Sequence, residues 1–151
     1  MTEKSTVFST FSIERIVPAS PARVFAAWST REAKSRWFAG PPGWKETESE
    51  FDFRVGGREV MGGAFPDGKT SLYRAQFHDI VPNERIVYGY TMDADADRIS
   101  VSVTTVEFAS AGDGTTLTFT EQGVFLDGHD TVVIREKGTA ELLDQLGASL
   151  A

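Results

Sequence analysis

The chain opens with an alternation of apolar and polar residues. In residues 7–17, VFSTFSIERIV, one parity carries Val7, Phe11, Ile13 and Val17, whereas the other carries mostly polar side chains. A period of two over this length predicts a strand with one buried face.

Helical signals follow this strand. Ser20 precedes Pro21 at the start of SPARVFAAWS, which is the order expected for an N-cap and the first helical residue. The next residues, STRE at 29–32, form a capping-box pattern that predicts a second short helix. The stretch AGPPGW at 39–44 must end that helix, because proline cannot continue it.

Residues 45–125 return to alternation, in segments separated by turn residues. The segments FDFRV, REVMGGAF, SLYRAQFHDIV, RIVYGYTM, ISVSVTTVEF and TLTFTEQGVF each predict a strand, and the DADADR stretch at 93–98 predicts an acidic loop. The pair Gly56-Gly57 separates the first two segments. It is compatible with a turn, a bulge or a close approach of a ligand, and it favours a sharp bend or tight turn.

The last segment changes period. Between residues 130 and 151 the buried stripe steps by four, three and four residues, at Thr139, Leu143, Leu146 and Leu150. This spacing predicts a long helix, and Asp130 or Thr131 can cap it. We therefore predict an α+β fold. A curved antiparallel sheet of about six or seven strands covers the long C-terminal helix, and two short helices follow the first strand.

Composition and charge narrow the classes of function. The 151 residues fit one domain, residues 1–151, and 40% of them are hydrophobic, which is typical of a globular core. The net charge of −7 disfavours nucleic acids and anionic membranes as partners. No long apolar run predicts a membrane span or a signal peptide, and the chain has no cysteine, so we expect a cytoplasmic protein without disulfides.

Five stretches together resemble the START-like superfamily, also called Bet v 1-like or SRPBCC. They are ERIVPASPARVFAAWS, the WF pair at 37–38, FDFRVGGRE, HDIVPNERIVYGY and GTTLTFTEQGVF. Their order is most similar to the family named for the activator of the Hsp90 ATPase, which includes calicheamicin-resistance-type proteins. The resemblance covers nearly the whole chain. It implies a helix-grip fold with an apolar cavity between the sheet and the long helix.

The chain departs from these relatives at one position. Many of them carry tryptophan after a glycine of the last helix, whereas this chain has Gly138-Thr139. Either the cavity is larger here or another aromatic ring fills the space.

A set of residues predicted to face inward forms the candidate ligand-binding wall. Their tyrosines would add hydroxyl groups to an apolar surface, as small-molecule pockets require. Any one of them is equally compatible with an ordinary core. The residues are Trp28, Trp37, Phe53, Tyr73, Phe77, Tyr88, Tyr90, Phe119, Thr139 and Leu143.

Two glutamates are the candidate catalytic residues. Glu121 continues the apolar parity of Leu117 and Phe119, and Glu59 shares its face with Met61. A carboxylate in an apolar pocket would have a raised pKa and could act as an acid or a base. The alternative is a solvated glutamate or one paired with a cation, for which the candidates are Arg54, Arg58 and Arg74.

We predict no metal site and no cofactor. His78 falls on the polar parity of its strand, and His129 with Asp127 and Asp130 makes a weak cluster in a loop. Neither a dinucleotide-binding glycine pattern nor a serine–histidine–acid pattern is present.

Three functions remain open. The first is a binding protein for an apolar, lipid-like or polyketide-like small molecule. The second, suggested by the resemblance, is a co-chaperone-like module that contacts a protein partner and regulates an ATPase. The third is a cyclase-like or hydrolase-like enzyme that uses Glu59 or Glu121. The sequence is compatible with a monomer or a homodimer.

Overall fold

The structure, a computed structural model, describes residues 3–151. Its seven strands form one antiparallel sheet in the order β1-β7-β6-β5-β4-β3-β2. This confirms the predicted α+β helix-grip fold. The strands are β1 (Thr6–Val17), β2 (Lys45–Phe51), β3 (Arg58–Ala64), β4 (Thr70–Val81), β5 (Arg85–Ala94), β6 (Asp97–Ala111) and β7 (Gly114–Leu126).

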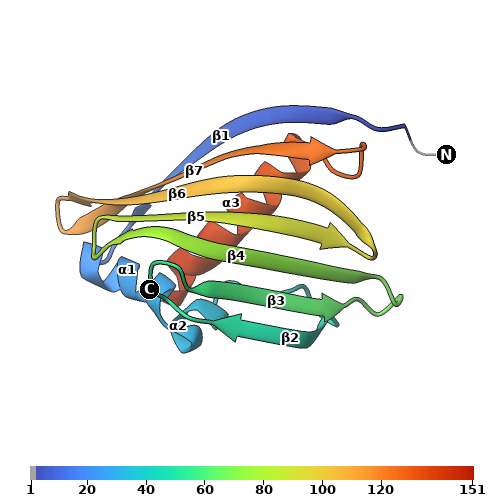
Figure 1. The fold of residues 1–151 in the computed structure, drawn as a ribbon. Coiled ribbons are helices and arrows are strands. Elements are labelled where there is room, and N and C mark those ends of the chain that lie inside the picture. Colours follow the sequence, from blue (N-terminus) through green and yellow to red (C-terminus); the bar gives the residue numbers. More distant parts are fainter. Residues whose placement is uncertain (1–2) are drawn as a thin grey trace.

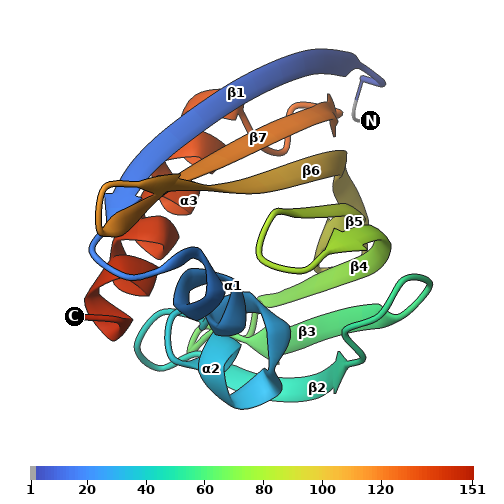
Figure 2. The same cartoon turned by 90° about the vertical axis from the view of Figure 1, so that its left-hand side faces the viewer.

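Three helices lie on the concave side of this sheet. They are α1 (Pro21–Ser29), α2 (Arg31–Ser35) and α3 (Val132–Ser149). The sheet arches over α3, which lies beneath β1 and β7. The helices α1 and α2 lie nearer the β2–β3 side (Figures 1 and 2). The two groups of helices therefore bound the interior from different directions.

The helix starts follow local hydrogen bonding. Ser20 accepts a hydrogen bond from the Arg23 amide, and Thr131 accepts one from the Ile134 amide, as N-caps do. For α2 the predicted cap was displaced by one residue. Thr30, not Ser29, accepts from the Ala33 amide. The stripe on α3 is confirmed at Thr139, Leu143 and Leu146, which are buried, whereas Leu150 is the C-cap and is only partly buried.

The double glycine lies in a turn, and the predicted strand over FDFRV was wrong. β2 ends at Phe51, and the Asp52 amide donates to the Arg58 carbonyl across the turn. Gly56 has a φ of 85°, and a Cβ on Gly57 would lie 2.1 Å from the Asp52 carbonyl oxygen. These two requirements, a left-handed backbone and a close approach of the chain, explain both glycines. The DADADR loop is also shorter than expected, because β5 runs to Ala94 and β6 starts at Asp97.

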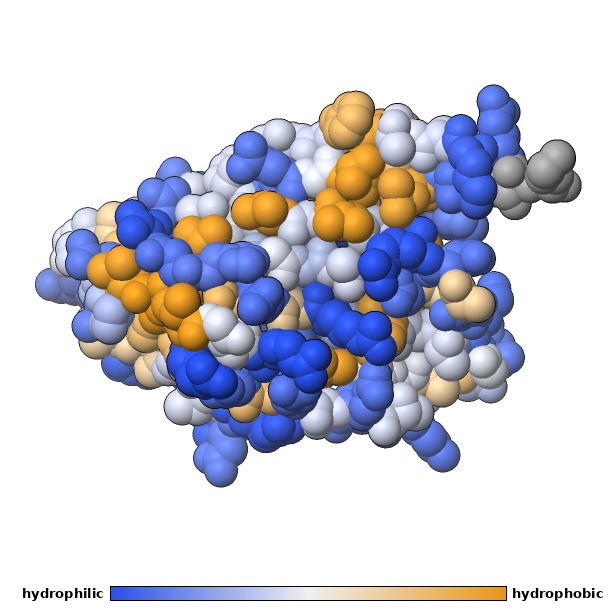
Figure 3. Space-filling view, in the orientation of Figure 1, coloured by the Kyte–Doolittle hydropathy of each residue, from blue (hydrophilic) through white to orange (hydrophobic). Residues whose placement is uncertain are grey.

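Apolar side chains also gather on the convex face. Phe8 on the edge strand β1 is 80% exposed; it lies opposite Val124, which lies opposite Val101. Figure 3 shows apolar side chains over this part of the sheet, near the start of β1. Val7 is exposed as well, so the buried face of β1 begins only at Phe11. In residues 3–151, no helix is long and apolar enough to cross a membrane.

Candidate functional site

A cavity of about 340 Å³ lies between α3, the sheet and the segment that follows α2. Nine aromatic residues line it, together with methionine, leucine and a few polar side chains. All three tryptophans of the chain are among them. The aromatic residues are Trp28, Trp37, Phe38, Trp44, Phe65, Tyr73, Tyr88, Tyr90 and Phe119.

Eight of the ten predicted wall residues line this cavity. They are Trp28, Trp37, Tyr73, Tyr88, Tyr90, Phe119, Thr139 and Leu143. Phe53 and Phe77 instead pack in the core, with ring centroids 5.0 Å apart. Because β2 ends before Phe53, that ring leaves the strand and contacts Phe25 of α1 at 5.7 Å.

Sequence reasoning missed Trp44. Its indole Nε1 donates to Ser71 Oγ at 3.2 Å, and its ring occupies the space that a side chain at position 63 would need. A Cβ on Gly63 would lie 2.1 Å from that ring. The Gly62-Gly63 pair within a strand was the available signal, since glycine in a strand often marks the close approach of another group.

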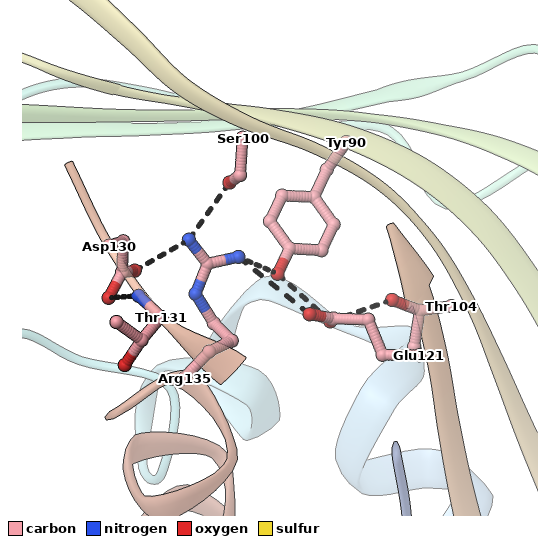
Figure 4. A network of polar contacts seen from close by, with 7 residues as sticks. All are labelled: Tyr90, Ser100, Thr104, Glu121, Asp130, Thr131 and Arg135. Atoms are coloured by element: carbon pink, nitrogen blue, oxygen red, sulfur yellow. Dashed lines mark hydrogen bonds and ion pairs between the residues drawn. The ribbon is translucent and has the colours of Figure 1, made fainter. Parts of the chain in front are cut away.

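Arg135 of α3 is the centre of one polar network in the cavity wall. Its Nη1 donates to the Tyr90 hydroxyl at 2.8 Å, and its Nη2 donates to Ser100 at 2.8 Å and to Asp130 at 3.0 Å. Glu121 Oε2 lies 3.7 Å from Nη1. The side chains converge from β5, β6, β7 and α3 (Figure 4).

Glu121 is the buried acceptor of this network. Its Oε1 accepts hydrogen bonds from the Tyr90 hydroxyl at 2.9 Å and from the Thr104 hydroxyl at 3.1 Å. Burial raises the pKa of Glu121 above its ordinary value, although the Tyr90 hydrogen bond and the charge of Arg135 oppose this effect. Burial, followed by the charge of Glu121, raises the pKa of Tyr90, which therefore keeps its proton.

A second polar group, the Lys34–Glu59 ion pair, lies near α2. The ammonium of Lys34 donates to Glu59 Oε1 at 2.5 Å, and the two residues are only 3% and 5% exposed. Lys34 lines both the main cavity and a smaller pocket of about 60 Å³ next to it. The ammonium therefore lies between the two spaces.

The cations that pair with the two glutamates were not those expected. Arg54 pairs with Asp52 and Arg58 with Glu50 on the surface, and Arg74 is exposed. Lys34 and Arg135 take their places from the helices. Neither helix adjoins its glutamate in sequence, so the pattern of the strands alone carried no signal for these pairs.

Residues 3–151 contain no group of three or more histidine, cysteine, aspartate or glutamate side chains placed to hold a metal ion. His78 lies on β4 with an exposed side chain. Of the candidate acidic partners of His129, Asp130 bonds to Arg135 and Asp127 accepts from the Ser5 amide.

Solved structures with similar folds span almost the whole chain. The Mll3558 protein from Rhizobium loti is 47% identical with a TM-score of 0.90, covering 97% of this chain and 99% of its own. A putative uncharacterized protein from Rhizobium leguminosarum is 46% identical with a TM-score of 0.93, covering 99% and 98%. The AHSA1-like protein from Aeromonas hydrophila is 25% identical with a TM-score of 0.69, covering 93% and 91%.

No match was found among curated proteins. The family model described as activator of Hsp90 ATPase homolog 1-like protein matches residues 18–151. This range begins just before α1 and contains every residue of the cavity wall. The chain therefore belongs to the family of proteins similar to the activator of Hsp90 ATPase homolog 1.

Proposed function

We propose that the protein binds a small, largely apolar molecule in the cavity beside α3. The observation that carries this proposal is an aromatic wall around about 340 Å³ of space, interrupted by two polar groups. Ligand pockets in proteins have volumes of about 300–1,000 Å³ and combine apolar walls with a few polar groups. This cavity falls in the lower part of that range, which suits a compact ligand of one to three rings.

The residues at the middle of α3 support an open cavity. Gly138 and Thr139 both line it, and a Cβ placed on Gly138 would meet no atom within 4 Å. A tryptophan at position 139 would project a large ring from this part of the helix. The open space beside Gly138 supports the larger cavity, one of the two expectations for this position.

Native mass spectrometry of the protein as purified from cells tests the proposal. Leu143 is 3% exposed and lines the cavity, so Leu143→Trp should fill part of the space and prevent binding. The matched control is Val133→Trp on the same helix, where the side chain is 74% exposed. We expect a stoichiometric small molecule on the wild type and on the control, but not on Leu143→Trp.

A protein that carries no molecule after purification is titrated with 2-ethylnaphthalene. All three tryptophans line the cavity, so a ligand that enters it must change their fluorescence. Absence of any saturable change, together with an empty purified protein, overturns the proposal. Equal binding by Leu143→Trp and Val133→Trp would show that the molecule binds elsewhere.

A second candidate function is acid–base catalysis by Glu121. A buried carboxyl with a raised pKa in a cavity wall can exchange protons with a bound molecule. Glu59 is less suited, because its carboxylate is held by Lys34. The test is to incubate the molecule released from the protein with wild type and with Glu121→Gln, and to follow its conversion by chromatography. Conversion by the wild type alone, with binding retained in the variant, supports catalysis; no conversion by either excludes it for that molecule.

A further inference from the structure

We propose that Lys34 recognises a neutral carbonyl oxygen of the cavity ligand, with Glu59 holding the ammonium in place. This inference rests on the proposed binding function and names the polar group that the ligand must carry. It follows from how the hydrogen-bond donors of the ion pair are used, and from the charges around it.

The ammonium of Lys34 has more donors than partners. A lysine side chain carries three N–H donors. Within residues 3–151, its single hydrogen bond is the one to Glu59 Oε1. Burying a charge with donors that no protein atom satisfies is costly, so these donors favour an acceptor supplied from the cavity. An oxygen atom supplied by a ligand would satisfy one of them.

Aromatic rings surround the ammonium instead of further acceptors. Five ring centroids lie between 4.7 and 6.0 Å from Nζ, and four of these rings also line the main cavity. Rings at this distance attract a cation, but they do not accept a conventional hydrogen bond from its N–H donors. The five are Trp28, Trp37, Phe38, Phe51 and Tyr88. A flat ligand lying among these rings would bring a carbonyl substituent to the ammonium.

The charge balance favours a neutral acceptor over an anionic one. The pair Lys34–Glu59 is already neutral, and a ligand carboxylate would place a second negative charge beside Glu59. The adjoining small pocket also carries Glu46 and Glu50 against Arg31. Like charges at such short range oppose binding, so a ketone or ester oxygen fits where a carboxylate does not.

The donors of Arg135 are more fully used than those of Lys34. Its Nη2 serves Ser100 and Asp130, and its Nη1 serves Tyr90 with Glu121 nearby. Two carboxylates already compensate the guanidinium charge. A ligand oxygen there would meet a cation that already has three hydrogen-bond partners, whereas at Lys34 it would meet a cation that has one.

The test compares three ligands with one aromatic frame: 2-acetylnaphthalene, 2-ethylnaphthalene and 2-naphthoate. Their dissociation constants are measured by tryptophan fluorescence. We expect the wild type to prefer the ketone over the ethyl compound by about tenfold or more, the gain of one hydrogen bond to a charged donor. 2-Naphthoate should bind more weakly than the ketone.

The variant pair is Lys34→Met/Glu59→Leu, in which both charges are removed so that neither remains buried alone. It should bind 2-ethylnaphthalene as the wild type does within about threefold and lose the preference for the ketone. The matched control is Arg85→Met/Asp79→Leu, which removes an exposed ion pair on β4 and β5. It should keep the preference.

Each outcome separates this inference from the proposed function. If the wild type binds none of the three compounds, the binding function fails for ligands of this size. If it binds the ketone and the ethyl compound equally, or prefers the naphthoate, the cavity binds ligands but recognition by Lys34 is wrong. A ketone preference that survives in Lys34→Met/Glu59→Leu overturns the inference as well.

Discussion

The two polar groups of the cavity wall differ in how completely their cations are satisfied. Arg135 donates to three side chains, and two carboxylates surround it. Lys34 donates to Glu59 alone and otherwise faces aromatic rings. Lys34 is buried and Arg135 is partly buried, and both come from helices that face the concave side of the sheet. They therefore differ in the number of hydrogen-bond partners and in the number of neighbouring carboxylates.

This difference separates a structural role from a recognition role. The network around Arg135 joins α3 to β5, β6 and β7, so it fixes the helix against the sheet. The Lys34–Glu59 pair joins α2 to β3 through a single hydrogen bond and leaves donors available at the cavity. A network whose donors are mostly used stabilises the fold, whereas unused donors at a cavity can bind a ligand.

Removing Arg135 should have the largest effect on stability. Arg135→Met leaves Glu121 and Asp130 without their cation, and breaking a buried ion pair on one side costs about 3–5 kcal/mol of unfolding free energy. Chemical denaturation measures this loss. Arg98→Met, which removes an exposed cation paired with Asp93, should change it by less than about 1 kcal/mol. Equal losses in the two variants would contradict a structural role for the network.

Removing Lys34 should have a smaller effect that a second substitution reverses. Lys34→Met leaves one carboxylate, Glu59, buried and unpaired, at a cost of about 3 kcal/mol. Adding Glu59→Leu should bring the unfolding free energy back to within about 1 kcal/mol of the wild type, since no charge then remains. At Arg135 the addition of Glu121→Gln should recover less, because Asp130 still lacks its cation and the Tyr90 hydroxyl still lacks the Arg135 donor. Full recovery at both positions would remove the distinction between them.

The pH dependence of the unfolding free energy should show the raised pKa of Glu121. Its pKa in the folded protein is raised above the ordinary 4.5. Between pH 4.5 and the folded pKa, the folded state therefore binds more protons than the unfolded state. The unfolding free energy contributed by Glu121 is therefore present below pH 4.5 and decreases as the pH rises through the folded pKa. Glu121→Gln should lack this decrease in a denaturation series from pH 4 upward. Parallel curves for the two proteins would contradict the raised pKa.

The smallest effect is expected on the convex face. Phe8→Ser changes a side chain that is already exposed, so ligand binding should stay the same and the unfolding free energy should change by less than about 0.5 kcal/mol. Sedimentation of the two proteins at several concentrations is the companion measurement. A change in ligand affinity would show that the cavity depends on this distant surface.

Local signals predicted most of the fold. Ser20 and Thr131 cap their helices as expected, and the stripe Thr139, Leu143 and Leu146 faces the interior. These features depend on residues within one or two turns of each other, so a sequence pattern can contain them. The strand expected over FDFRV was wrong, because alternation continues through a turn whose shape is set by Gly56 and Gly57.

The sequence identified the acidic member of each polar group in the cavity wall but not its cationic partner. Glu59 and Glu121 were identified because they stand on apolar strand faces. Their partners Lys34 and Arg135 were missed, since α2 is only five residues long and α3 reaches the sheet through contacts 14 to 45 residues away in sequence. Pairing of this kind depends on how the helices pack against the sheet, which the spacing of residues in the sequence does not predict.

A crystal structure of the wild-type protein with 2-acetylnaphthalene would test the central claim most directly. The account predicts the ring system among Trp28, Trp37 and Tyr88, with its ketone oxygen within hydrogen-bonding distance of Lys34 Nζ and the Arg135 network unchanged. A ligand bound on the outer face of the sheet, or one inside the cavity with its ketone directed toward Arg135, would contradict it.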